Sequence, residues 1–167
     1  MIDLGDKSHC ICKRHNNTQN ECIDAYTIRE KGKSVKLTPK TSSENVMAII
    51  LDKCVITDKK TKCDAMYLYE AKHKKYSFLV ELKGAGDIEK AFHQLSYTKN
   101  KRVEYKDILE KFKNIDAKQI TERFAIVSNG LLSKTKLEQL ENSYKIRVRT
   151  ILQSEATNPI PDLKEVL

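Results

Sequence analysis

The sequence predicts an α/β fold in which a mixed central sheet is flanked by helices. Two apolar runs, residues 65–69 and 76–82, are short, rich in aromatic residues and joined by a basic linker at 71–75, which is typical of a β-hairpin. An amphipathic segment at 87–99 follows, and strand, helix and strand patterns then alternate toward the C-terminus. This order predicts one sheet with helices on both faces.

The first third of the chain is expected to add short strands to this core. Residues 1–24 are polar and lack periodicity. Residues 25–30 and 34–38 have the pattern of two short strands, and the Lys-Gly-Lys sequence at 31–33 suits the turn of a hairpin. Residues 46–51 form a short apolar run in which β-branched residues recur, which favours a strand over a helix.

Residues 87–99 form the clearest helix pattern in the sequence. Asp87 suits the N-cap position, because its carboxylate can accept a hydrogen bond from an unpaired amide of the first turn. The apolar positions recur at the spacing i, i+3, i+4 and i+7 and are occupied by Ile88, Ala91, Phe92 and Leu95. One face of this helix is therefore expected to pack on the sheet.

Further strand and helix patterns follow this helix. The charged stretch at 99–118 is expected to form a solvated helix and loop. Residues 124–127 have the pattern of a buried strand and residues 134–142 that of a helix. Both are expected to belong to the layers of the same domain.

The C-terminal end of the chain is expected to supply an edge strand and a tail. Residues 144–152 alternate between apolar and polar, which predicts a strand with three basic side chains on one face: Lys145, Arg147 and Arg149. Residues 154–167 contain two prolines, and we expect this C-terminal tail to leave the domain.

Length and charge limit the classes of protein to which this chain can belong. Its 167 residues are enough for one domain with a substantial core, which we expect to span residues 1–167. The net charge of +8 fits a polyanionic partner and, equally, a lysine-rich surface that serves only solubility; where a nucleic acid is bound, lysines suit contacts to its backbone. No apolar stretch is long enough for a membrane span, and no secretory signal is evident, so we expect no membrane partner and a cytoplasmic location.

The N-terminal segment combines cysteines with histidines. Cys10, Cys12, His15 and Cys22 could in principle supply four zinc ligands, but the spacing Cys-x-Cys is tighter than in most zinc sites and no second ligand pair follows. Because we expect a cytoplasmic location, we predict reduced, buried thiols for the five cysteines.

Three charged residues lie where the predicted hairpin strands end. Asp64 opens the first strand, and Glu81 and Lys83 share a face at the end of the second because side chains alternate along a strand. Unpaired charge is costly to bury, so such a trio is typical of a site with chemistry or an ion. Two carboxylates suit Mg²⁺, which can polarise a phosphate and acidify a bound water, and a lysine can stabilise developing charge.

The pattern of Asp64, then Glu81-Leu82-Lys83, then a helix carrying Gln94 resembles the PD-(D/E)xK nuclease superfamily, which includes restriction endonucleases and Holliday-junction resolvases. The resemblance covers about a quarter of the chain closely. It implies a restriction-endonuclease-like fold, Mg²⁺ or Mn²⁺ held by Asp64, Glu81 and the Leu82 carbonyl, and a catalytic role for Lys83. It also implies a supporting role for Gln94 in orienting water or phosphate.

Two departures from the family pattern stand out. Cys63 occupies the position before Asp64, where many members have proline. Many members also have a further glutamate on a preceding helix, and no single residue of this sequence is identified as its equivalent.

The leading hypothesis is therefore a Mg²⁺-dependent endonuclease for which DNA is favoured over RNA as the substrate, and the resemblance is compatible with restriction, junction resolution or phage defence. A single centre would cut both strands of a duplex only as a homodimer or in two encounters. One alternative is a catalytically inactive nuclease-fold module that binds nucleic acid or a partner protein. Another is a structural ion-pair cluster formed by Asp64, Glu81 and Lys83 in a protein unrelated to nucleases.

Overall fold

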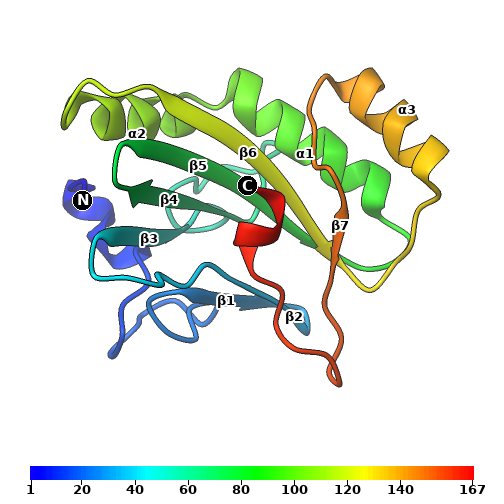
Figure 1. Cartoon of the computed structure of the whole chain (residues 1–167), viewed down its shortest axis with the longest axis horizontal. Coiled ribbons are helices and arrows are strands. Elements are labelled where there is room, and N and C mark those ends of the chain that lie inside the picture. Colours follow the sequence, from blue (N-terminus) through cyan, green and yellow to red (C-terminus); the bar gives the residue numbers. More distant parts are fainter.

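The computed structural model describes all 167 residues and has a mixed α/β fold built on one five-stranded sheet (Figure 1). The strands lie in the order β3-β4-β5-β6-β7. Their bounds are β3 (Glu44–Ile50), β4 (Ala65–Ala71), β5 (Lys74–Lys83), β6 (Ile120–Ser128) and β7 (Ile151–Gln153). The first three strands are antiparallel, and β5, β6 and β7 are parallel, so the predicted mixed sheet is confirmed.

The two faces of the sheet are covered differently. One carries α1 (Ile88–Lys101), which contacts β5 and β6, with α2 (Val103–Asn114) and α3 (Lys134–Tyr144) beside it. The other carries the hairpin of β1 (Thr27–Glu30) and β2 (Lys33–Lys36) together with the 3-10 helix η2 (Leu163–Val166). Helices were expected on both faces, and a hairpin covers most of the second. No helix has the length and apolar character needed to cross a bilayer.

The hairpin of β4 and β5 fixes the register on which the predicted site depends. The strands extend further than the apolar runs indicated, and a turn at Lys72 and His73 connects them, with Lys72 at φ 52°. Ala65 pairs with Val80, so the residue before Ala65 lies beside the residue after Val80. Asp64 and Glu81 are therefore neighbours at the same end of the sheet.

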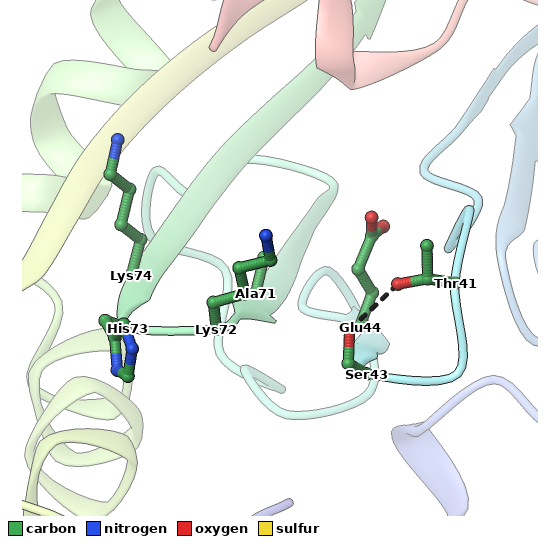
Figure 2. Close-up of a pocket in the computed structure, with 7 residues that line it drawn as sticks. All are labelled: Thr41, Ser43, Glu44, Ala71, Lys72, His73 and Lys74. Atoms are coloured by element: carbon green, nitrogen blue, oxygen red, sulfur yellow. Dashed lines mark hydrogen bonds between the residues drawn. The ribbon is translucent and has the colours of Figure 1, made fainter.

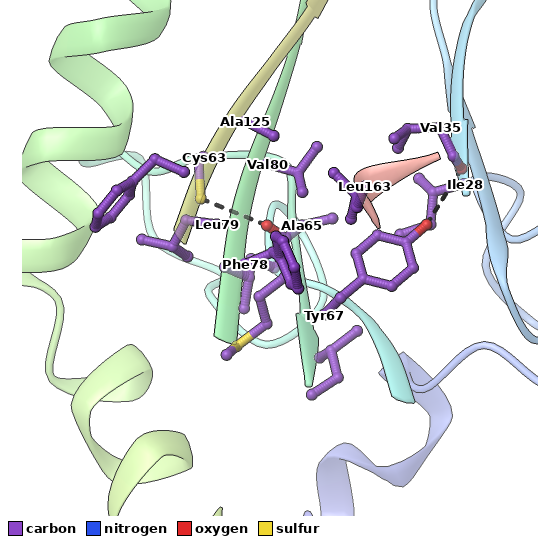
Figure 3. Close-up of a cluster of buried hydrophobic side chains, with 14 of the residues drawn as sticks. Ile28, Val35, Cys63, Ala65, Tyr67, Phe78, Leu79, Val80, Ala125 and Leu163 are labelled. Carbon is purple, nitrogen blue, oxygen red and sulfur yellow. Dashed lines mark hydrogen bonds between the residues drawn. The ribbon is translucent and has the colours of Figure 1, made fainter. Parts of the chain in front are cut away.

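The core packs the sheet against the β1–β2 hairpin around Tyr67. Tyr67 is fully buried, and its hydroxyl donates to the carbonyl oxygens of Tyr26 and Val35, each at 3.2 Å. Figure 3 shows the ring pointing from β4 toward Ile28 and Val35, with Leu163 beside it. A tyrosine suits this position because its ring fills the core and its hydroxyl satisfies carbonyls of the hairpin.

The hairpin itself forms as predicted. Its strands pair from Thr27 opposite Lys36 to Glu30 opposite Lys33, which leaves a two-residue turn. Lys31 and Gly32 both have positive φ, at 48° and 76°, as the hairpin turns that match strand twist require. The turn places Glu30 at the very end of β1.

The predicted strand at 144–152 is wrong for most of its length. Tyr144 ends α3, Lys145 is its left-handed C-cap at φ 55°, and only Ile151–Gln153 form a strand. Alternation correctly predicted burial, since Ile146 and Val148 are buried and the basic residues that alternate with them are exposed. The Val148 amide donates to the Glu141 carboxylate at 3.0 Å, so a side chain replaces a strand partner.

The C-terminal tail does not leave the domain as expected. Lys36 forms an isolated bridge with Asp162, and Leu163 and Val166 are buried. Asp162 and Glu165 form a capping box at the start of η2. The apolar residues after the two prolines explain why the tail returns to the hairpin side of the sheet.

The prediction of reduced cysteines is also wrong for four of the five. Disulfides join Cys10 to Cys54 and Cys12 to Cys22, and only Cys63 is free, where it is buried. These sulfurs bond to one another, which excludes the zinc alternative for the N-terminal segment. The Cys10–Cys54 bond attaches η1 (Gly5–Cys10) to the loop that follows β3. Sequence spacing did not indicate this pairing because the two cysteines are 44 residues apart.

Candidate active site

The carboxylates of Asp64 and Glu81 are each bound by a main-chain amide, at the end of the sheet where β4 begins and β5 ends. The Asp64 amide donates to Oε2 of Glu81 at 3.1 Å, and the Leu82 amide donates to Oδ2 of Asp64 at 2.7 Å. Glu81 is fully buried and Asp64 is 9 % exposed. Both carboxylates are thus fixed in position by main-chain donors, which is the precision a catalytic or metal-binding group requires.

Lys83 joins this pair as its sequence position predicted. Its ammonium Nζ lies 3.0 Å from Oε1 of Glu81, and its side chain is 13 % exposed. Oε1 accepts no hydrogen bond of good geometry, and its one ion pair is with this ammonium. The charged trio therefore meets at one end of the sheet, with a single lysine for two buried carboxylates.

Two further acidic residues approach Asp64 from elements that the sequence analysis did not connect to it. Glu30 comes from the end of β1 and Asp52 from the loop after β3, and carboxylate oxygens of both lie with one of Asp64 within 4.8 Å of one another. The Asp64 carbonyl accepts from the amides of Leu51 and Asp52 at 2.9 and 3.2 Å, which fixes that loop beside it. Asp52 also pairs with Lys62, whose Nζ lies 3.5 Å away.

The only sequence signal for these two residues is their position at strand ends. Glu30 is followed by a hairpin turn, and Asp52 follows the apolar run of β3 directly. Neither position resembles the helix glutamate of the PD-(D/E)xK pattern. Contact between them depends on how the hairpin packs on the sheet, which local sequence does not specify.

Three carboxyl groups at this site, those of Asp64, Glu81 and Glu30, have raised pKa values. Burial, together with the charge of Glu81, raises the pKa of Asp64 to about 7. Burial also raises the pKa of Glu81 to about 7, although Lys83 opposes the shift. Glu30 has its pKa raised to about 7 by burial and by Asp64. Burial lowers the pKa of Lys83, but the Glu81 carboxylate outweighs it and the net shift is upward.

Gln94 lies near the cluster but contacts the chain beside it. Its Nε2 donates to the Lys62 carbonyl at 2.9 Å, while its Oε1 is buried without a hydrogen-bond partner. Thr98, one turn later on α1, accepts from the Cys63 amide at 2.9 Å. These bonds hold the segment that leads into Asp64, so the observed contacts of Gln94 are structural, and its role toward water or phosphate stays a prediction.

The loop between Lys83 and α1 packs closely against Gly130, which lies in the connection between β6 and α3. A Cβ on Gly130 would lie 2.8 Å from the backbone of Ala85, so this approach requires glycine. The Gly130 amide is itself fixed by a hydrogen bond to Oγ of Ser128 at 3.0 Å. The close contact positions the backbone that connects Lys83 to α1.

A surface pocket lies at the other end of β4. It has a volume of about 500 Å³ and is formed around the β4–β5 turn and the start of β3, where Figure 2 shows Glu44 across from Lys72 and His73. Ala71 in this pocket and Ala65 beside the carboxylates are six residues apart along the strand, or about 20 Å. The pocket is therefore separate from the carboxylate cluster.

The donor set of the cluster suits a hard divalent cation. Four carboxyl groups converge, and only two ammonium groups, those of Lys83 and Lys62, lie within ion-pair distance of them. Carboxylate oxygens are the ligands that Mg²⁺ and Mn²⁺ prefer. A divalent cation would replace the protons that burial now favours, and it would leave Lys83 free to act on a ligand.

No family model, curated protein or solved structure matches this chain. Function must therefore be inferred from the side chains of the cluster and their chemistry. That chemistry is a pair of carboxylates anchored by main-chain amides, with Lys83 beside Glu81, at the end of the sheet where β4 begins and β5 ends.

Proposed function

We propose that this chain is a metal-dependent endonuclease with a restriction-endonuclease-like fold that hydrolyses phosphodiester bonds of DNA. The observation that carries the proposal is the reciprocal anchoring of Asp64 and Glu81 beside Lys83. A structural ion-pair cluster would be expected to balance its charges, whereas this one concentrates carboxylates. Asp64 and Glu81 hold Mg²⁺ or Mn²⁺, with Glu30 or Asp52 supplying the further carboxylate.

The remaining steps follow from the residues themselves. The bound metal supplies Lewis-acid polarisation of the phosphate and a more acidic water. Lys83, released from its pairing with Glu81, donates to the attacking water or to a non-bridging phosphate oxygen. The Leu82 carbonyl remains a proposed ligand. Its amide is already used to orient Asp64, which keeps the carboxylate directed at the site.

Cleavage assays test this proposal directly. Supercoiled plasmid, linear duplex, branched DNA and single-stranded RNA are incubated with the protein in Mg²⁺, Mn²⁺ or EDTA. We expect metal-dependent cutting that Glu81→Ala and Lys83→Ala each reduce at least about 100-fold. Glu89→Ala, which removes an exposed carboxylate on α1, is the matched control and should retain activity.

The outcomes distinguish the proposal from its alternatives. Full activity in Glu81→Ala would reject the assigned site. An absence of cutting together with salt-sensitive binding would favour a catalytically inactive nucleic-acid-binding module. A preference for branched DNA would favour a resolvase, and clean double-strand breaks would favour a homodimer, as expected for restriction or phage defence.

The cytoplasmic location stays a prediction that the disulfides make testable. Disulfides persist mainly in oxidising compartments. Counting free thiols in protein trapped rapidly from cells gives one thiol, that of Cys63, if both bonds form there, and five if the compartment keeps all the cysteines reduced.

A further inference from the structure

A basic pocket adjoins the carboxylate cluster. Its volume is about 240 Å³, and its lining consists entirely of polar residues: Asp52, Lys59, Lys60, Thr61, Lys62, Lys90, His93 and Gln94. Asp52 belongs both to this pocket and to the cluster around Asp64. The pocket and the cluster are thus continuous through one residue.

The loop that carries most of these lysines is held rigidly. Arg102, which is only 4 % exposed, binds both carboxylate oxygens of Asp58 at 3.1 and 2.6 Å. The Lys62 ammonium donates to the carbonyls of Asp58 and Lys60 at 2.5 and 3.1 Å. Gln94 fixes the Lys62 carbonyl from α1. The loop therefore needs little ordering when a ligand binds, which lowers the entropic cost of binding.

Three of the lysines remain uncommitted. Lys59, Lys60 and Lys90 are exposed, and no acidic group lies within 4.0 Å of any of their ammonium groups. Lys62, by contrast, is used by Asp52 and by the loop carbonyls. Three lysines that lack an acidic partner line one pocket, which makes the pocket complementary to a phosphate-rich ligand.

We infer that this pocket binds the sugar–phosphate backbone of the substrate strand next to the scissile bond. The inference rests on the proposed nuclease function and names how the substrate is held. Lysine ammonium groups contact phosphates without reading bases, so binding here is independent of sequence. A strand seated on Lys59, Lys60 and Lys90 continues past Asp52 to the carboxylates.

Binding measurements separate the pocket from catalysis. Fluorescence anisotropy of a labelled single strand, and then a duplex, is recorded in EDTA across a salt series. The test variant is Lys59→Gln/Lys60→Gln/Lys90→Gln. The control, Lys72→Gln/Lys74→Gln/Lys113→Gln, removes the same charge from exposed lysines outside the pocket. We expect the test variant to raise Kd at least about tenfold and to make the salt slope shallower by about 2, with much smaller changes in the control.

Each outcome decides one question. Equal losses in both triple variants would overturn the inference, because general charge and not the pocket would then set affinity. If the native protein cuts no substrate yet the pocket variant alone loses binding, the pocket stands and the nuclease proposal fails. In an active enzyme, the pocket variant should raise KM far more than it lowers kcat. The single reversal Lys90→Glu, on the surface of α1, provides an independent check.

Discussion

Strand β5 carries a buried charged residue near each of its ends. The charge at the start of the strand is balanced by its neighbours, and the charge at the other end is not. At its start, Lys75 is 1 % exposed, and its ammonium lies 2.6 Å from Asp116, 2.8 Å from the Phe112 carbonyl and 4.6 Å from the centre of the Phe112 ring. At its other end, Glu81 is fully buried within a group of carboxylates and has one lysine beside it.

The difference teaches how to separate structural from functional charge. Lys75 meets a carboxylate, a carbonyl and an aromatic face, so its charge is satisfied within the fold and ties the end of α2 to the sheet. The carboxylates around Glu81 outnumber the ammonium groups beside them, and burial raises the pKa of Asp64 and of Glu81 to about 7, so a proton or an added cation would complete their charge balance. A buried charge that the fold leaves unbalanced indicates a ligand from outside it.

The largest expected effect is the loss of nuclease activity when Glu81, the buried carboxylate at the end of β5, is neutralised. Glu81→Gln keeps the size of the side chain and an oxygen for the Asp64 amide, so the fold should remain at least as stable at pH 7.5. Nuclease activity should fall at least about 100-fold, because a metal ligand and the partner of Lys83 are lost. Parallel cleavage assays and urea unfolding measure the two effects. A variant as active as the native protein would show that the buried charge of Glu81 has no catalytic role.

Removing the charge of Lys75 should lower stability and leave activity unchanged, the reverse of the result expected for Glu81→Gln. Lys75→Met keeps the apolar stem but leaves the Phe112 carbonyl without its donor and Asp116 without its buried partner. We expect a loss of about 3 kcal/mol in the free energy of unfolding, with kcat unchanged in the folded protein. Urea unfolding tests this against Lys74→Met, which changes the exposed neighbouring lysine. Equal stability of the two variants would show that the contacts of Lys75 contribute little.

The pH dependence of stability provides a third test. Asp64, Glu81 and Glu30 ionise at about pH 4 in an unfolded chain and at about pH 7 in the fold, so the native state holds extra protons between these values. In EDTA, this cluster should therefore lower stability as pH rises from 4.5 to 7.5, by at least about 3 kcal/mol if only one of the three groups shows the full shift, and Tm should fall accordingly.

Added Mg²⁺ should reduce that loss, because it binds the ionised folded state. Glu81→Gln should flatten the profile in EDTA. The lowered pKa values of Glu44 and Asp58 act mainly below this interval and do not reverse the sign. A native Tm that rises steadily from pH 4.5 to 7.5 in EDTA would contradict the assignment of protonated carboxyls to this site.

The smallest effect is expected for Asp116→Asn. Hydrogen bonds from Lys118 and Lys75 hold the pKa of Asp116 well below its usual range, and its side chain is 25 % exposed. The variant leaves Lys75 its carbonyl and its aromatic contact, so the stability loss should be smaller than that of Lys75→Met. Thermal unfolding of both variants in one buffer ranks them, and the reverse ranking would indicate that the carboxylate is the main partner of Lys75.

The sequence predicted those site residues that come together through the pairing of two consecutive strands, β4 and β5. Alternation along β4 and β5 and a short turn bring Asp64 beside Glu81, and both residues were identified from the sequence together with Lys83. Glu30 and Asp52 were missed because they reach Asp64 only when a separate hairpin packs on the sheet. The same limit applies to the Cys10–Cys54 bond and to the returning tail, since both depend on contacts between distant segments.

The order of strand pairing also has a consequence for how the protein forms. Every carboxylate of the candidate site, and Lys83 with them, lies between residues 30 and 83, whereas β6, the parallel partner of β5, begins only at Ile120. During synthesis, the acidic cluster is therefore complete in sequence while β5 still has an unpaired edge. Non-local parallel pairing is slow, and an open edge invites association with other chains. Docking of β6 is thus the folding step at which we expect temperature and chaperones to have most influence on yield.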